Sequence, residues 1–243
     1  MSGSVAIVGA GPGDPGLITV RGLDLLRRAD VVVYDRLVNP KLLDEAPPTA
    51  RLVFAGKACG AHTLSQREIN ALLIAEARAG HRVVRLKGGD AFVFGRGGEE
   101  ALALAEAGVA FEVVPGVTSA VAVPAAAGIP LTHRGVASSF AVVTGHGEAG
   151  GPSRVDWSRL AHGVDTLVVL MGLANLRAIA ETLIAHGRDP ATPAALIERG
   201  TTEAQRTIVT TLAELPDAAA AARLESPVVT VIGPVVSLSP LLS

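Results

Sequence analysis

Two glycine-rich segments of this chain contain carboxylates, and those side chains limit the chemistry that the segments can perform. Asp14 ends the segment GAGPGD, and Asp90 follows Lys87 in the segment RLKGGDAFVFGRGGEE. A carboxylate among the glycines repels a phosphate, and no Ser or Thr follows Lys87 as it does in a P-loop. The two segments therefore suit a ligand that carries an amine or sulfonium cation better than a phosphate ligand.

The first of these segments also resembles part of a dinucleotide-binding fingerprint. Gly9 and Gly11 follow an apolar run, and Asp35 ends the next apolar run, where a ribose-binding acid would lie. The last glycine of the fingerprint is replaced by Asp14. Spacing alone leaves a nicotinamide-dependent oxidoreductase open as an alternative.

Short β-branched runs alternate with helical stretches in the first half of the chain. This alternation implies a mostly parallel sheet with helices on its faces. Ligands of such sheets bind beyond the carboxyl ends of the strands, where the glycine-rich segments fall. The predicted strands are Val5–Gly9, Asp30–Asp35, Arg51–Phe54, Arg82–Leu86 and Phe111–Val114, and the predicted helices are Ile18–Ala29, one capped by Ser65, and Gly98–Ala107.

The second half shows a related but more mixed pattern. Pro115–Pro130 is predicted to form a buried loop, a helix and a turn, and Leu176–Ile184 carries the apolar stripe of a helix. The polar turn at Gly200–Ala204 favours an antiparallel hairpin. We therefore predict two α/β domains: residues 1–117 with a mostly parallel sheet, and residues 118–243 with a mixed sheet. The strands expected in the second domain are Ser139–Thr144, Thr166–Met171, Pro193–Glu198, Arg206–Thr211 and Val228–Ile232.

Composition excludes several classes of protein. With 49% hydrophobic and 18% charged residues among 243, the chain is not disordered, and 3% aromatics with a net charge of −2 disfavour binding to nucleic acid or an anionic membrane. The longest uncharged stretch, Val113–Thr132, contains three prolines and cannot form one spanning helix. Cys59 is the single cysteine, which excludes a disulfide framework within the chain, and no metal-ligand spacing is present. The N-terminus lacks the basic region of a signal peptide, so we expect a cytoplasmic protein.

A series of motifs, in order along the chain, resembles a known family. They are VGAGPGDPGLITVRG, VVVYDRLV, GKACGAHTLSQREIN, RLKGGDAFVFGRGGEE, VVPGVTSA, GIPLTHRG and TGH. Together they resemble the uroporphyrinogen-III C-methyltransferases, within the tetrapyrrole (precorrin-type) methylases, over nearly the whole chain. The related ribosomal-RNA and diphthamide methylases do not carry YDRLV, the GK…QxEIN stretch and FGRGGEE together. Ala91 stands where the family usually has proline, which should loosen that loop slightly.

The resemblance implies two α/β domains with a cleft between them, S-adenosylmethionine as methyl donor, and a homodimer. It also implies transfer of two methyl groups to C2 and C7 of uroporphyrinogen III, which gives precorrin-2 for sirohaem or cobalamin biosynthesis, and S-adenosylhomocysteine. Such a transfer needs alignment of a pyrrole carbon with the sulfonium methyl, and a group that accepts a proton. Another precorrin methylase, an NAD-dependent oxidoreductase and a non-catalytic cofactor-binding module remain the alternatives.

The matching motifs imply roles for individual residues. Asp35 and Lys57 match the family's proposed proton acceptor and donor, although Asp35 could instead cap a loop or pair with Arg36 or Lys57. Arg96 matches a catalytic position and, with Glu99, His146 and Met171, a position on the tetrapyrrole side of the cleft. An arginine suits a polycarboxylate because its fork binds a carboxylate at two points. The implied cofactor contacts are Pro12, Gly88, Gly89, Asp90, Val93, Thr118, Ser119, Met171 and Gly200.

Overall fold

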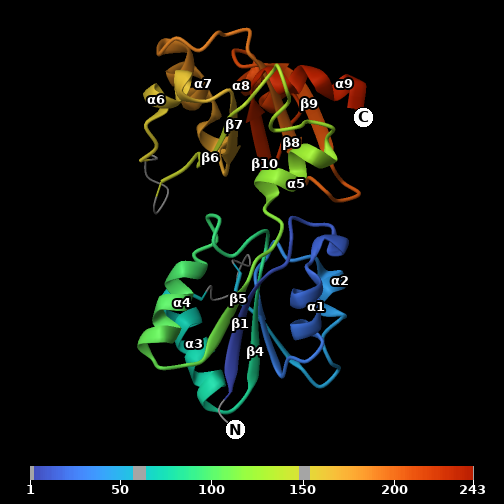
Figure 1. Cartoon of the computed structure of the whole chain (residues 1–243), viewed down its shortest axis with the longest axis vertical. Helices are drawn as coiled ribbons and strands as arrows, with labels where there is room; N and C mark the ends of the chain where they lie inside the picture. The colour runs from blue at the N-terminus through green and yellow to red at the C-terminus, as the bar shows by residue number, and fades with distance from the viewer. Residues whose placement is uncertain (1–2, 57–63, 148–153, 243) are drawn as a thin grey trace. The chain divides into compact units, whose positions relative to one another are not determined.

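The chain forms two compact α/β units, Met1–Thr118 and Ser119–Ser243 (Figure 1). The computed structural model describes residues 3–56, 64–147 and 154–242. The first unit, called here the N-terminal unit, holds a parallel sheet. The second, called the C-terminal unit, holds a mixed sheet. The predicted fold class is therefore confirmed.

The sheet of the N-terminal unit has its strands in the order β3-β2-β4-β1-β5, and neighbouring strands are parallel. All carboxyl ends therefore lie at one edge, and the loops that follow the strands gather there. The strand β4 lies between β1 and β2, so β1 pairs with β4 and β5. The strands are β1 (Ser4–Gly9), β2 (Val31–Tyr34), β3 (Arg51–Phe54), β4 (Arg82–Lys87) and β5 (Phe111–Val114).

Alternate residues of the central strands bury against helices on opposite faces of this sheet, as the period of two for a strand requires. Val5 and Ile7 pack in the cluster with α3 (Gln66–Arg78) and α4 (Gly97–Glu106). Ala6 and Val8 pack in the cluster with α1 and α2. Figure 1 shows the two pairs of helices on either side of the sheet. The helices of the second face are α1 (Val20–Leu26) and the short α2 (Pro40–Leu43).

Side-chain caps precede α1, α2 and α3. Ser65 caps α3 as predicted, and with Glu68 it forms a capping box: Ser65 Oγ accepts from Glu68 N at 3.3 Å, and Glu68 Oε2 accepts from Ser65 N at 2.7 Å. The helix α1 starts at Val20 instead of Ile18, because Thr19 caps it. A separate 3-10 turn, η1 (Pro15–Leu17), precedes it.

The C-terminal unit has its strands in the order β6-β7-β10-β8-β9. The pair β6–β7 is parallel, whereas β10 is antiparallel to both neighbours and β8–β9 is the predicted antiparallel hairpin. The strands are β6 (Phe140–Thr144), β7 (Thr166–Leu170), β8 (Pro193–Glu198), β9 (Arg206–Thr211) and β10 (Val228–Ile232). The helical segments are α5 (Ser119–Ala126), α6 (Trp157–Gly163), η3 (Leu173–Asn175), α7 (Leu176–Ala185), α8 (Leu215–Ala221), η4 (Pro234–Leu238) and α9 (Ser239–Leu242).

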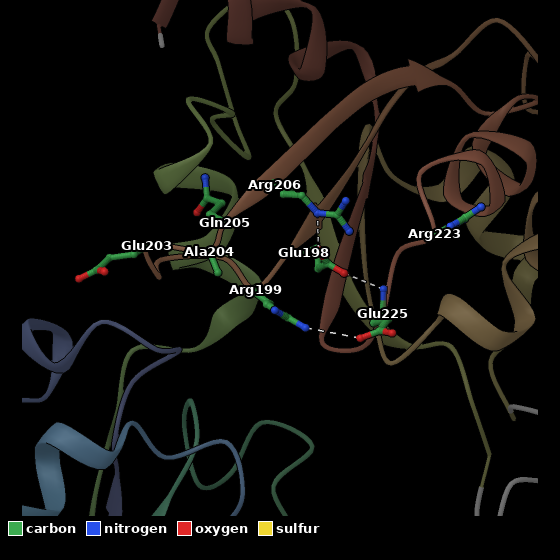
Figure 2. A pocket seen from close by; sticks show the side chains of 8 residues that line it. All are labelled: Glu198, Arg199, Glu203, Ala204, Gln205, Arg206, Arg223 and Glu225. Atoms are coloured by element: carbon green, nitrogen blue, oxygen red, sulfur yellow. Dashed lines mark hydrogen bonds and ion pairs between the residues drawn. The ribbon is translucent and has the colours of Figure 1, made fainter.

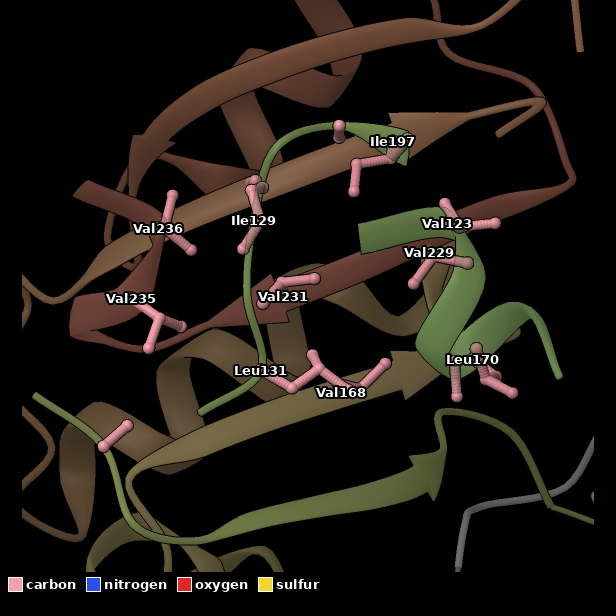
Figure 3. Packing of buried hydrophobic residues seen from close by; sticks show 14 residues of the cluster. Val123, Ile129, Leu131, Val168, Leu170, Ile197, Val229, Val231, Val235 and Val236 are labelled. Atoms are coloured by element: carbon pink, nitrogen blue, oxygen red, sulfur yellow. The ribbon is translucent and has the colours of Figure 1, made fainter. Parts of the chain in front are cut away.

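Two apolar clusters cover the two faces of this second sheet. On one face, Val123 of α5 and Val235 of η4 pack with Val168 and Val231 of the strands (Figure 3). The other face is covered by α6, α7 and α8, and the predicted apolar stripe of α7 is buried there. In the described parts of both units, no helix has the length and apolarity needed to cross a membrane.

At the opposite, amino-terminal edge of the first sheet, Asp30 and Arg82 form an ion pair. Asp30 accepts from Arg82 N at 2.8 Å, from Nε at 3.0 Å and from Nη2 at 2.7 Å. The hydrogen bonds from the Arg82 side chain and backbone lower the pKa of Asp30 from 3.8 to about 2. A carboxyl whose pKa is lower in the folded state stabilises the fold above its unfolded pKa, and this contribution disappears as the pH falls toward the folded pKa.

We therefore expect Asp30→Asn to lower the free energy of unfolding at pH 7. We also expect this free energy to fall less between pH 4 and pH 2 than it does in the parent protein. The side chain of Asp30 is 37% exposed, so solvent screening keeps the effect below about 1 kcal/mol. Urea unfolding followed by circular dichroism at several pH values measures it. Asp217→Asn, at an exposed pair with Arg177, is the control. If the free energy of unfolding fell equally with pH in Asp30→Asn and in the parent protein, this expectation would be contradicted.

Candidate functional site

Three loops meet backbone to backbone at the carboxyl edge of the N-terminal sheet. Gly89 N donates to Gly11 O at 2.7 Å, and Gly11 N donates to Gly89 O at 3.2 Å. A Cβ atom on Gly9 would lie 2.5 Å from Gly116 Cα, and one on Gly116 would lie 2.4 Å from Gly89 O. The loops after β1, β4 and β5 approach this closely because these positions carry no side chain.

Asp90 ties two of these loops together. Its Oδ1 accepts from Phe92 N at 2.8 Å, within the loop after β4, and its Oδ2 accepts from Gly116 N at 2.9 Å, in the loop after β5. A carboxylate has about four acceptor positions, so acceptor capacity is left for a ligand. The side chain that was predicted to contact a cofactor thus has a structural role as well.

The other predicted cofactor residues of this unit lie in the same loops. Pro12 is half-buried after β1, and Gly88, Gly89 and Val93 are half-buried after β4. At Gly88 an added Cβ would lie 2.8 Å from the Cβ of Leu37. The structure therefore brings Pro12, Gly88, Gly89, Asp90 and Val93 to one edge of one sheet.

The loop between β4 and α4 is strained. Phe94 and Arg96 have φ angles of 52° and 59°, in the left-handed region that L side chains rarely adopt. Gly95, between them, packs so closely that a Cβ would lie 2.7 Å from the carbonyl oxygen of Ala91, which also accepts from Gly97 N at 3.0 Å. Strain of this kind persists where the surroundings hold it, and it clusters at functional sites.

Arg96 and Glu99 form a two-point ion pair on the surface of this loop. Arg96 Nε donates to Glu99 Oε1 at 2.8 Å, and Arg96 Nη2 donates to Glu99 Oε2 at 2.8 Å. The hydrogen bonds from Arg96 hold the pKa of Glu99 below its ordinary value. The guanidinium is thus presented in a geometry that fits a carboxylate, and a ligand carboxylate could exchange with that of Glu99.

A buried cluster of charges lies beneath this edge, and sequence reasoning missed it. Glu100 Oε1 accepts from Arg85 Nε at 3.0 Å, from Lys87 Nζ at 3.1 Å and from Gln66 Nε2 at 3.1 Å. Arg85 Nη2 in turn donates to Asp35 Oδ1 at 2.6 Å. The signal in the sequence is that Arg85 and Lys87 stand two residues apart in an apolar strand, on one face, and need a buried anion.

Asp35 is the member of this cluster that solvent reaches. Its side chain is 29% exposed, and its Oδ2 lies 3.7 Å from Lys87 Nζ. Burial, and then the charge of Arg85, hold the pKa of Lys87 below its ordinary value, while Glu100 and Asp35 act in the opposite direction. Asp35 therefore pairs with residues of β4. Lys57, predicted as its partner in proton transfer, lies outside the described residues.

In the C-terminal unit the loops after β6 and β7 also meet at glycines. A Cβ on Gly145 would lie 2.2 Å from Gly172 Cα, and Asn175 Nδ2 donates to Gly145 O at 2.8 Å. Met171, just before Gly172, has a φ of 55° and is 46% exposed. A strained and exposed methionine at a strand end fits a ligand-facing role better than core packing.

The remaining predicted residues are placed as follows. His146 is half-buried, with Nδ1 3.2 Å from Thr144 Oγ1. Gly200 is buried, and an added Cβ would lie 2.3 Å from Cγ1 of Val123, so packing against α5 already explains a glycine there. Ser119 is the first residue of α5. Thr118 is the last residue of the N-terminal unit.

A hollow of about 380 Å³ lies at the end of the β8–β9 hairpin (Figure 2). Its charges pair with one another: Glu198 accepts from Arg206 Nε at 2.6 Å, and Glu225 lies 3.5 Å from Arg199. The hydrogen bond from Arg206, and a second one that the backbone amide of Glu225 donates to Glu198 Oε1 at 2.6 Å, hold the pKa of Glu198 below its ordinary value. The pairs account for most of the charges around the hollow, which is lined by Glu198, Arg199, Glu203, Ala204, Gln205, Arg206, Arg223 and Glu225.

The strand order argues against dinucleotide binding. In the Rossmann fold the strand with the glycine fingerprint pairs with the strand that ends in the ribose-binding acid. Here β4 separates β1 from β2, and Asp35 faces Arg85 of β4. Asp14 accepts from Gly16 N at 2.8 Å and caps only the short η1. Within residues 3–56, 64–147 and 154–242, no group of three or more His, Cys, Asp or Glu could hold a metal ion.

Comparisons with known proteins point in one direction. A family model described as "Tetrapyrrole (Corrin/Porphyrin) Methylases" matches residues 4–216. A uroporphyrinogen-III C-methyltransferase of Priestia megaterium is 49% identical over 98% of this chain and all of its own length. Siroheme synthase 2 of Aeromonas hydrophila is 53% identical over 97% of this chain, which spans about half the length of that relative.

A solved structure gives the same result at the level of the fold. The uroporphyrin-III C-methyltransferase of Thermus thermophilus, complexed with S-adenosylhomocysteine, superposes with a TM-score of 0.83 at 46% sequence identity. The match covers 97% of this chain and 99% of that one. The likeness therefore includes both units and the loops at their strand ends.

Proposed function

This chain is a member of the tetrapyrrole (corrin/porphyrin) methylase family, and from this premise we propose that it methylates uroporphyrinogen III at C2 and C7, with S-adenosylmethionine as methyl donor. The products are precorrin-2, for sirohaem or cobalamin biosynthesis, and S-adenosylhomocysteine. One observation carries the proposal: Asp35, Arg96 and the acid-containing glycine loops gather at the carboxyl edge of one sheet.

The residues at this edge fit the proposed donor. The glycines at positions 11, 89 and 116 allow backbone groups to approach a nucleoside, and Asp90 has acceptor capacity for an ammonium or a ribose hydroxyl. When bound, S-adenosylmethionine supplies a methyl group made electrophilic by its sulfonium. We propose that its contacts are Pro12, Gly88, Gly89, Asp90, Val93, Thr118, Ser119, Met171 and Gly200.

We propose a role for each of the chain's own side chains, that of Lys57 from the resemblance to the family alone. Arg96 binds a carboxylate of the tetrapyrrole through its fork, in exchange for Glu99. Asp35, half-buried beside Arg85, accepts a proton that the tetrapyrrole loses when the new carbon–carbon bond forms. Lys57 donates a proton during rearrangement of the ring, and a further proton leaves to solvent, so each methyl group gained is balanced by one proton lost. Glu99, His146 and Met171 complete the contacts to the tetrapyrrole, and correct alignment supplies most of the rate gain.

The proposal is tested with the purified protein, uroporphyrinogen III generated in situ and S-adenosylmethionine. Mass spectrometry should show a gain of two methyl groups and formation of S-adenosylhomocysteine. No methyl gain with intact cofactor would overturn the proposal. Transfer only to an already methylated tetrapyrrole would identify another precorrin methylase, and cofactor binding without turnover would identify a binding module.

We also propose that the protein is a cytoplasmic homodimer. Edge strand β3 supports this, because Leu52 and Phe54 are exposed on one face of it and would gain from burial against a partner. Light scattering under reducing conditions should give twice the chain mass of 24.7 kDa. The reductant matters because Cys59 could join two chains artificially. A mass of one chain at micromolar concentration would contradict this expectation.

A further inference from the structure

Glu100 is fully buried, yet it is a carboxylate with three donors on one oxygen and none on the other. Its exposed fraction is 0%, and among the described residues its Oε2 has no hydrogen-bond partner. A buried carboxylate is costly unless cations compensate it, and a pair of apolar residues would often serve stability as well or better. Stability alone is therefore a poor reason for this arrangement.

We propose that Glu100 is a positioning residue for methyl transfer: it holds Arg85 and Lys87 beneath Asp35, so that the Asp35 carboxylate is correctly aimed as the proton acceptor. This inference rests on the proposed function. Glu100 itself cannot exchange protons with a tetrapyrrole, because it is fully buried. It acts through the two cations of β4.

The geometry of Arg85 connects the two carboxylates. Its Nε donates to Glu100 at 3.0 Å and its Nη2 donates to Asp35 at 2.6 Å, so one planar guanidinium spans both acids. Arg85 Nη1 also donates to the carbonyl oxygen of Val33 at 3.3 Å. Because the fork is rigid, Glu100 and this carbonyl together determine the direction in which Nη2 points. The third bond, from Gln66 of α3 to Glu100, fixes the carboxylate in turn.

The charges of the cluster balance when all four groups are ionised. Arg85 and Lys87 from β4 face Asp35, and Glu100 from α4 compensates them. Glu99, also on α4, acts electrostatically on Lys87, and α3 contributes only the neutral Gln66. The exposed Arg36 follows Asp35 directly in the chain. Removal of the charge at position 100 therefore leaves an excess positive charge beside Asp35.

The decisive experiment compares kcat and KM of methyl transfer between Glu100→Gln and the parent. The amide keeps the size of the side chain but removes its charge, so position 100 no longer holds Arg85 and Lys87 in place. Arg85 Nη2 then loses its fixed direction toward Asp35, and the misaligned base lowers kcat by about tenfold at an unchanged KM. Binding of S-adenosylmethionine, measured by calorimetry, should not change.

Glu76→Gln is the matched control. Glu76 is a largely buried acid of the same unit with two basic partners, Arg51 and His81, at the opposite edge of the sheet. Its replacement removes the same charge at the same kind of site but far from Asp35 along the strands. We expect this variant to lose stability and to keep the kcat of the parent.

Each outcome has one meaning. A parent protein that transfers no methyl group refutes the proposed function. An active parent together with a Glu100→Gln variant of parental kcat overturns this inference, even where stability or KM changes. If Glu100→Gln does not fold, Glu100→Asp decides. The shortened acid keeps the charge but loses its hold on Arg85, so kcat must fall severalfold, and a parental kcat overturns the inference.

Discussion

Gly116→Ala lowers the free energy of unfolding of the N-terminal unit by about 2–3 kcal/mol and abolishes measurable binding of S-adenosylmethionine. The new Cβ would lie 2.4 Å from Gly89 O and 2.6 Å from Gly9 Cα. Both atoms belong to backbone, which has no alternative rotamer. Gly89 is also bonded to Gly11, and the amide of Gly116 is bonded to Asp90, so relief of the clash separates all three loops.

The matched control is Gly98→Ala. Gly98 lies in the first turn of α4, and an added Cβ would meet nothing within 4 Å. Alanine is the better helix former, so this variant should be as stable as the parent or more stable by up to about 1 kcal/mol. Chemical denaturation gives the stabilities, and calorimetric titration gives the affinity. If Gly116→Ala bound S-adenosylmethionine with the affinity of the parent, the close approach of Gly9, Gly89 and Gly116 would not be part of the cofactor site.

The strands were predictable from the sequence because strands that are buried on both faces of a sheet are nearly continuous apolar runs. The run at Val31–Tyr34 and the run at Val228–Ile232 were located in this way. Helices were harder to find when their buried face is small. In α8 only Leu215 and Ala219 are buried, and two residues are too few to form an apolar stripe that spacing can detect. The short α2 begins at Pro40 and has one buried residue, Leu42.

The order of strands in the N-terminal sheet was not predictable from spacing, since its pairings join residues that are distant in the chain. A fingerprint with Gly9, Gly11 and Asp35 is compatible with dinucleotide binding only when β1 lies beside β2. The insertion of β4 between them removes that possibility. The resemblance to a family separated the alternatives at the sequence level, whereas the residue pattern by itself left them open.

The chemistry of the edge was only partly visible in the sequence. The position of the glycine loops at the carboxyl ends of strands follows from the alternation of strands and helices. The same alternation does not tell which of two adjacent acids is buried, because the positions of Glu99 and Glu100 differ only by a rotation of about 100° around α4. Asp90 was expected to face a ligand, and its bonds to two backbone amides could not be read from composition.

Arg96→Ala should leave binding of S-adenosylmethionine nearly intact and reduce methyl transfer by about tenfold to a few hundredfold. Arg96 is exposed at the start of α4, away from the glycine contacts, and its side chain is paired with that of Glu99. A hydrogen bond to a charged group contributes roughly 1.5–3 kcal/mol, which sets the size of the loss. Alanine carries the same Cβ as arginine, so the strain of the left-handed backbone at this position is unchanged.

Two variants make the interpretation of Arg96→Ala specific. Asp90→Ala should weaken cofactor binding, because it removes an acceptor and releases Gly116 from the loop after β4. Arg21→Ala, at an exposed pair with Glu112 in the same unit, removes an arginine that none of the proposed contacts uses, and it should behave like the parent. Calorimetric titration beside a product assay on all three variants separates binding from turnover. If Arg96→Ala binds no cofactor, or methylates at the parental rate, Arg96 is not the anchor of the tetrapyrrole. A loss of methyl-transfer rate far beyond a few hundredfold would instead assign its guanidinium a part in the chemical step itself.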